Sequence, residues 1–145
     1  MIYIGIDTGT HTGVAVWDSR QRTLIQVETL KIHQAMDLVK HWKNKCSDQG
    51  ARLIVRVEDA RKRKWFPKKF SRKGEEENVL QGAGSVKRDA TIWDDFLADL
   101  KVEYQMVEPK GGMTKYTQER FEALTGWKKR TSEHARDAVM LVFGF

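Results

Sequence analysis

The first part of the chain alternates between apolar and other residues, a spacing that predicts β-strands. Three strands are predicted in succession, over residues 2–7, 13–18 and 23–30, with a polar turn between the second and the third. In the first of them isoleucines occupy alternate positions, so one of its faces is expected to be buried. Strands that follow one another this closely predict an antiparallel meander.

The spacing of apolar residues then changes to that of helices, with a recurrence every three or four positions. Helices are predicted over residues 33–48 and 78–100, and strands over 53–58 and 102–107. Two glycines within the second helix disfavour it, by about 1 kcal/mol each relative to alanine. The two strands after the meander each follow a helix, as strands of a parallel arrangement do.

Two shorter helices are predicted near the C-terminus, the first from Thr114 to Leu124 and the second from a cap at Thr131 or Ser132 to about Phe143. The resulting order, β-β-β-α-β-α-β-α-α, predicts an α/β fold with a five-stranded mixed sheet flanked by helices. No repeat or linker divides the chain, so all 145 residues are expected to form one domain.

The composition predicts a folded domain without a membrane anchor. Hydrophobic residues make up 40% of the chain, and no apolar run approaches the roughly 20 residues that span a bilayer. Asp7 interrupts the first hydrophobic stretch, and no basic segment precedes it, so a secretion signal is not expected. Cys46 is the only cysteine, which excludes an internal disulfide and fits a cytoplasmic location.

Positive charge is concentrated in one segment. The chain has a formal net charge of +6, but residues 61–73 hold eight basic residues and no acid, so the remainder is slightly acidic. Aromatic side chains within this segment can stack on bases while the cations neutralise phosphates, although a solvated tether can carry such charge too. We therefore expect a DNA-contacting loop at about 60–77. The candidate contacts are Arg61, Lys62, Arg63, Lys64, Trp65, Phe66, Lys68, Lys69, Phe70, Arg72 and Lys73, with Lys110 from a later glycine turn.

Three acidic residues lie where a catalytic site is expected. Asp7 and Glu58 each end a predicted strand, and Asp137 lies near the start of the last predicted helix. Open α/β sheets form their sites where parallel strands finish, and a helix can cover that edge. Clustered carboxylates repel one another, so a cation is expected, and oxygen ligands favour Mg²⁺ or Mn²⁺. Two such ions in one site are suited to phosphodiester cleavage.

The additional ligand is open between two residues. His134 and Glu133 lie three and four positions before Asp137, so each shares a helix face with it. Lys115 follows a glycine turn and is a catalytic candidate because it could meet a phosphate. A structural role is the alternative for each acid: Asp7 could be a turn carboxylate at the end of its strand, and the other two could pair with basic neighbours. These neighbours are Arg56 and Arg61 for Glu58, and Arg136 and Lys129 for Asp137.

The chain resembles the RuvC-type Holliday junction resolvases of the RNase H-like (retroviral integrase) superfamily. The resemblance rests on Gly-Ile-Asp-Thr-Gly-Thr at 5–10 with the strand at 13–16, on Glu58 at the end of its strand, and on His-Ala-Arg-Asp-Ala at 134–138. It implies an RNase H-like fold and metal-dependent endonuclease action on branched DNA through paired nicks. Two Mg²⁺ ions would be held by Asp7, Glu58 and Asp137, with His134 where family members carry an Asp or a His.

The resemblance also implies a homodimer. Gln-Gly-Ala-Gly at 81–84 is similar to the glycine-bearing helix through which family members dimerise, so that two active sites face one four-way junction. The short chain and its divergent basic loop resemble phage-encoded relatives, which implies the cytoplasm of a bacterium or of a phage-infected host cell.

Two other functions fit parts of the pattern. The same opening is similar to the phosphate-binding turn of the actin, sugar-kinase and chaperone ATPase superfamily, whose fold duplicates its core, whereas this chain has room for one half. A catalytically inactive nucleic-acid-binding module on the RNase H-like fold is the other alternative. The full set of acids favours the nuclease over both.

Overall fold

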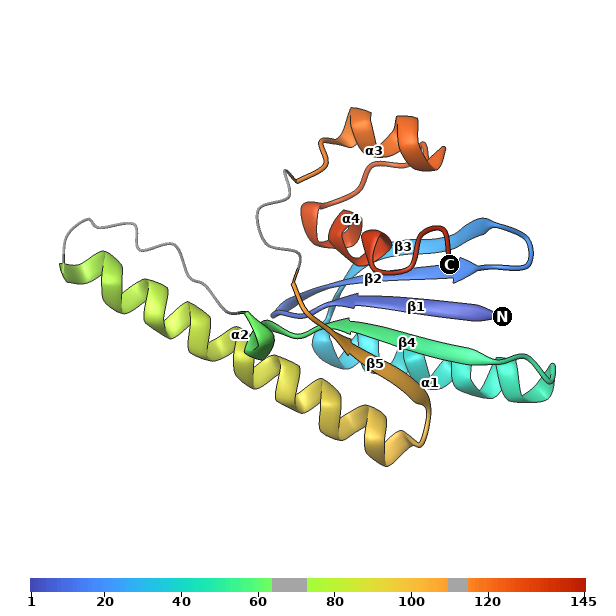
Figure 1. Cartoon of the computed structure of the whole chain (residues 1–145), viewed down its shortest axis with the longest axis horizontal. Coiled ribbons are helices and arrows are strands. Elements are labelled where there is room, and N and C mark those ends of the chain that lie inside the picture. Colours follow the sequence, from blue (N-terminus) through green and yellow to red (C-terminus); the bar gives the residue numbers. More distant parts are fainter. Residues whose placement is uncertain (64–72, 110–114) are drawn as a thin grey trace.

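A five-stranded mixed sheet forms the centre of the computed structural model, which describes residues 1–63, 73–109 and 115–145, without the side chains of residues 73–81 and 83 (Figure 1). The strands are β1 (Ile2–Asp7), β2 (His11–Asp18), β3 (Thr23–Lys31), β4 (Leu53–Glu58) and β5 (Glu103–Val107). They lie in the order β3-β2-β1-β4-β5. The first three pair antiparallel, while β1, β4 and β5 run parallel and therefore finish at the same edge.

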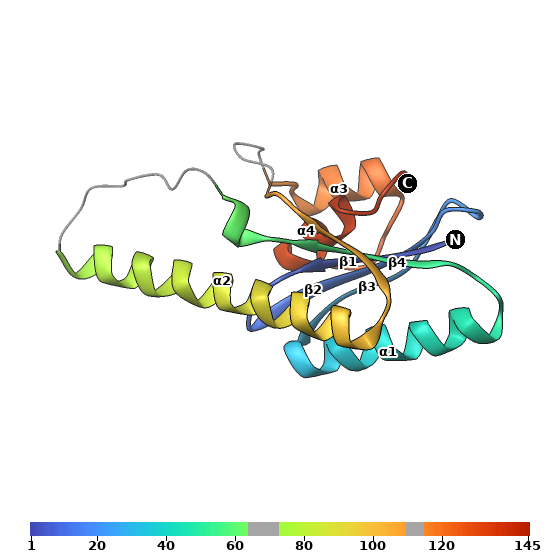
Figure 2. The same cartoon turned by 60° about the horizontal axis from the view of Figure 1, so that its bottom comes forward.

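Helices cover both faces of this sheet (Figure 2). They are α1 (Ile32–Asp48), α2 (Lys73–Leu100), α3 (Gln118–Thr125) and α4 (Glu133–Met140), with a short 3₁₀ helix, η1 (Ala60–Lys62), after β4. One face carries α1 and α2, and the other carries α4 with α3 beyond it. Within the described residues, no helix is long and apolar enough to cross a membrane.

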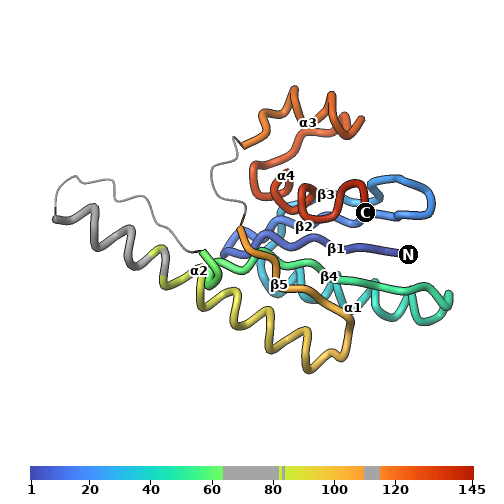
Figure 3. The backbone as a smooth tube through the Cα atoms, in the orientation of Figure 1, coloured from blue at the N-terminus to red at the C-terminus, as the bar shows by residue number. Residues whose placement is uncertain are grey.

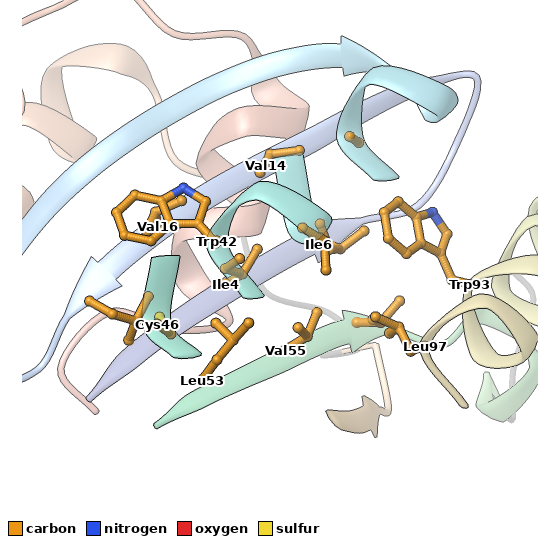
Figure 4. Packing of buried hydrophobic residues seen from close by; sticks show 14 residues of the cluster. Ile4, Ile6, Val14, Val16, Trp42, Cys46, Leu53, Val55, Trp93 and Leu97 are labelled. Carbon is orange, nitrogen blue, oxygen red and sulfur yellow. The ribbon is translucent and has the colours of Figure 1, made fainter. Parts of the chain in front are cut away.

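Side chains that alternate along the strands contribute to two hydrophobic clusters, one on each face of the sheet. Ile4 and Ile6 of β1 pack with Trp42 of α1 and Trp93 of α2, and all four are buried (Figure 4). The opposite face packs the apolar side of α4 together with Phe121 of α3. Figure 3 shows both termini at the edge of the sheet opposite to the one where β1 and β4 finish.

The α/β class, the mixed five-stranded sheet and the order of elements are confirmed, with corrections at helix ends. The long helix begins at Lys73, five residues earlier than predicted, and a Cβ atom added at Gly82 or Gly84 would meet no atom from outside the helix backbone within 4 Å. Part of the predicted basic loop is therefore η1, and its last residues belong to α2. Packing of Trp93 and Leu97 against the sheet outweighs the low helix propensity of the glycines.

The last two helices are shorter than predicted. Thr114 lies outside the described residues, and the cap of α3 is Thr117, whose hydroxyl accepts a hydrogen bond from the Arg120 N–H. Ser132, rather than Thr131, caps α4 by accepting from the Ala135 N–H. The chain leaves α4 after Met140 and continues as turns, although the apolar spacing runs on to Phe143.

Candidate carboxylate site

The ends of β1 and β4 bring two carboxylates together. In the parallel register Ile6 pairs with Val57, so Asp7 and Glu58 follow side by side at the edge of the sheet. Side chains alternate along a strand, and both acids therefore point to the face that α4 covers. Asp7 is only 6% exposed. The predicted convergence of these two acids is thus a feature of the fold.

The two carboxyl groups are poorly compatible with full ionisation. The hydrogen bond between them lowers the pKa of Asp7 and raises that of Glu58. Burial raises the pKa of Asp7 to about 6, with a further contribution from the negative charge of Asp137. Burial, the hydrogen bond to Asp7 and the charges of Asp7 and Asp137 raise the pKa of Glu58 to about 7. A positive charge beside the two acids is therefore favourable, and Lys115 and Arg63 supply part of it, since their charges lower the pKa values of Asp7 and Glu58 respectively.

The helix α4 adds a histidine and a third acid to this edge. His134 lies in its first turn, and the distance from its Nδ1 to Oδ2 of Asp7 is 2.8 Å. Asp137, three residues later, lies close enough for its charge to raise the pKa values of both strand-end acids. The structure thus brings together the three predicted acids and His134.

Two glycines allow α4 to lie directly on the sheet. A Cβ atom at Gly13 would stand 1.9 Å from the His134 carbonyl oxygen, and one at Gly5 would stand 2.1 Å from that of Ala138. Any side chain at either position would push the helix outward. The glycines that the sequence shows around the first strands therefore set the distance between α4 and Asp7.

Lys115 supplies positive charge next to α4. Its ammonium group forms an ion pair with the Glu133 carboxylate and lies 3.6 Å from Oδ2 of Asp137. Glu133 therefore faces Lys115, and the described contacts do not place it with Asp7 and Glu58. Asp137 pairs with neither of the basic neighbours considered above. The guanidinium of Arg136 instead donates to the carbonyl oxygens of Tyr116 and Thr131.

The donor set has the chemistry of a site for a hard divalent cation. Carboxylate oxygens are the ligands that Mg²⁺ prefers, and a cation would relieve the repulsion that raises the pKa values of Asp7 and Glu58. Among the described residues, however, no three His, Cys, Asp or Glu side chains form a preassembled group of metal ligands. The side chains therefore suit a divalent cation in chemistry and charge, while Asp137 pairs with Lys115 in this structure.

A second acid pair lies immediately beyond Glu58, on the other face of the sheet. Asp59 is 1% exposed, and Arg61 Nε and Nη2 donate to its two carboxylate oxygens at 2.8 Å each. The same guanidinium donates to Asp94 of α2 at 2.8 Å, and the Tyr104 hydroxyl donates to the other Asp94 oxygen at 2.7 Å. These hydrogen bonds hold the pKa values of both carboxyls below their usual range.

This arrangement gives Arg61 a structural role. Its guanidinium pairs with Asp59 and Asp94 and so anchors the start of the basic segment, and a contact of Arg61 with DNA stays a prediction. Glu58 pairs with neither of its expected basic neighbours, because Arg56 donates to the Leu141 carbonyl oxygen. In the sequence this anchor is indicated only by the two-residue spacing of Asp59 and Arg61. Asp94 joins the ion pair because the fold brings α2 beside it, which local spacing does not predict.

The remaining predicted DNA contacts are only partly described. The Lys62 ammonium group donates to the Met106 carbonyl oxygen at 2.6 Å, and Arg63 has interactions of its own. Lys73 begins α2, and the structure describes its backbone but not its side chain. The other predicted contacts lie outside the described residues, namely Lys64, Trp65, Phe66, Lys68, Lys69, Phe70, Arg72 and Lys110.

Comparison with protein families and with curated proteins found no match. No protein-family model matches the chain, and no curated protein matches it either. Its function has to be inferred from the chemistry of the carboxylate site and from the distribution of charge around it.

Proposed function

We propose that this protein is a metal-dependent, structure-selective DNA endonuclease with an RNase H-like fold, acting on four-way junctions in the manner of RuvC-type resolvases. The observation that carries the proposal is the pair formed by buried Asp7 and half-buried Glu58 at the ends of adjacent parallel strands. Their raised pKa values and the nearby Asp137 call for a cation at the place where such sheets form active sites.

The side chains divide into ligands and supports. Asp7, Glu58 and Asp137, with His134 in addition, would hold two Mg²⁺ ions, which supply an activated water and stabilisation of the leaving 3′-oxygen. His134 orients the Asp7 carboxylate through the 2.8 Å contact, and burial of Asp7 keeps bulk water from competing for it. Lys115 stands beside Asp137, where its ammonium group can meet a phosphate of the substrate.

The charge distribution supports nucleic acid as the substrate. The segment of eight basic residues begins three positions after Glu58, and its first residues are anchored to α2 through Arg61. A backbone held by this segment would pass next to the acids. Action as a homodimer would place two such sites on one four-way junction, as paired nicks require.

A nucleic-acid-binding module without catalysis is the second candidate. It is favoured by the lack of a preassembled ligand group in the described part of the chain and by the pairing of Lys115 with Glu133 and Asp137. In that function Lys115 would take the place of a metal ion as the counter-charge of the acids.

The decisive experiment is cleavage of labelled four-way junction, flap and linear duplex DNA in Mg²⁺ or in EDTA. We expect symmetric nicks in the junction that require Mg²⁺. Asp7→Asn should lower the cleavage rate by at least about 10³-fold while junction binding persists, because it removes a ligand and leaves the basic segment intact. Asp37→Asn, on the exposed side of α1, is the matched control and should cleave normally.

Each other result has a clear meaning. Cleavage by Asp7→Asn at the wild-type rate would refute the proposed role of the carboxylates. Junction binding without cleavage under any divalent cation would favour the non-catalytic module. ATP binding without cleavage would favour the ATPase-like alternative.

A further inference from the structure

A second basic element lies on the opposite side of the sheet from Arg61, at which the first basic segment begins. Lys128, Lys129 and Arg130 are consecutive and exposed, in the connection between α3 and α4. Residues 126–132 include no acid. We name residues 127–131 the α3–α4 basic loop. The predicted DNA contacts do not include these three residues.

The α3–α4 basic loop is held in one conformation by its neighbours. The Gln118 side chain donates to the Lys129 carbonyl oxygen and accepts from the N–H and the hydroxyl of Thr131. Arg136 donates to the Thr131 carbonyl oxygen at 2.8 Å. Trp127, at the other end, packs against the hydrophobic cluster beneath α4. The three cations are thus exposed on a backbone fixed from both ends.

The loop leads directly into the catalytic helix. Ser132, which follows it, caps α4, and the first turn of that helix carries His134. Figure 1 shows the connection from α3 returning along the sheet to the start of α4, near the edge where β1 and β4 finish. The nearest acid in sequence, Glu133, is already paired with Lys115, so it does not neutralise the trio.

We propose that Lys128, Lys129 and Arg130 form a second phosphate-contacting surface for nucleic acid, flanking the carboxylate site from the face that carries α4. The proposal rests on the proposed function in taking nucleic acid as the ligand. The first basic segment starts beside α2 on the other face, so the two elements would hold backbone on both sides of the acids. A fixed loop loses little conformational entropy when it binds, which makes its contacts more favourable.

The test measures how salt weakens junction binding. Binding of a labelled four-way junction in EDTA is followed over a series of salt concentrations, for the full chain and for Lys128→Gln, Lys129→Gln, Arg130→Gln combined. Each phosphate contact to duplex DNA contributes about 0.9 to the slope of log K against log salt. We expect the slope to become shallower by about 2–3 in the triple variant, and by about 0.9 in Arg130→Gln alone.

The matched control removes the same charge from the far edge of the sheet. Arg20, Arg22 and Lys101 are exposed in turns away from the ends of β1 and β4, and their combined replacement by glutamine should leave the slope near that of wild type. An equal loss in the control would overturn the proposal, because it would reflect net charge alone. Thermal melts of each variant establish that the fold is intact, and Arg130→Gln provides the same test if the triple variant does not fold.

The outcomes separate this proposal from the nuclease. A shallower slope in the variant of a protein that never cleaves would support the surface and refute the endonuclease. An unchanged slope in a protein that cleaves junctions would refute the surface and leave the endonuclease standing. A wild-type protein that fails to bind the junction would refute the surface outright.

Discussion

Two acid pairs begin at consecutive residues of the chain, and their surroundings are opposite. Glu58 faces Asp7 on one side of the sheet, and burial together with the negative charge of Asp137 raises the pKa values of both. Asp59 faces Asp94 on the other side, and the Arg61 guanidinium between them lowers both. Strand alternation separates the two pairs, although their residues are adjacent.

The difference shows how the same residue type serves structure or function. We call Asp59 and Asp94 the balanced pair, because both carboxylates bond to the Arg61 guanidinium, which stabilises the junction of β4 with α2. We call Asp7 and Glu58 the unbalanced pair, because burial raises both pKa values and the charges of Lys115 and Arg63 offset this only in part, so that ionising the two acids lowers stability. Arrangements of side chains that lower stability in this way are expected at functional sites.

Breaking the balanced pair should have the largest effect on stability. Arg61→Ala leaves Asp59 buried without its partner, and we expect the free energy of unfolding to fall by about 2–3 kcal/mol in urea titrations. The matched control is Arg52→Ala, which removes a bidentate pair with Glu103 at the surface and should cost much less. Equal losses in the two variants would contradict the structural role of the buried pair.

Displacing α4 should disturb the Asp7–Glu58 pair and leave the Asp59–Asp94 pair in place. Gly13→Ala introduces a Cβ that would overlap the His134 carbonyl oxygen, so we expect about 2 kcal/mol of destabilisation and a large loss of cleavage. Gly9→Ala is the control, because its Cβ would make an ordinary 3.6 Å contact. Urea unfolding and junction cleavage measure both effects, and wild-type behaviour of Gly13→Ala would show that α4 does not depend on this contact.

Removing one member of the unbalanced pair should stabilise the metal-free protein. The pKa of Glu58 rises from 4.5 to about 7 and that of Asp7 from 3.8 to about 6, so between about pH 4 and 7 the native state binds more protons than the unfolded state. Wild-type stability should therefore fall as pH rises through this window. Glu58→Gln should flatten the fall and raise stability by roughly 1–2 kcal/mol at about pH 8.

Urea titrations in EDTA at about pH 4 and pH 8 provide the measurement for Glu58→Gln. The gain should be largely lost at the lower pH, where Glu58 is protonated in the native state and mostly protonated in the unfolded state. Glu28→Gln, on the exposed part of β3, is a control that should not change the pH dependence. A variant as pH-dependent as the wild type would contradict the raised pKa of Glu58.

Much of the fold and part of the site followed from local pattern. The alternation of apolar residues predicted β1 and β4 to the residue, and with them the position of Asp7 and Glu58 at strand ends. Both carboxylates lie at one edge because parallel strands finish together, a rule that requires only the order of elements. The helix ends were less accurate, because caps and packing decide them.

The sequence by itself determined the class of fold, the strand-end acids and the confinement of positive charge to short segments, since each depends on neighbours along the chain. Only the tertiary structure decided which charges meet. Arg61 is an anchor because α2 brings Asp94 to it, and His134 reaches Asp7 because two glycines let α4 lie on the sheet. Such contacts join residues far apart in sequence, and their free energies depend on burial, which local spacing does not specify.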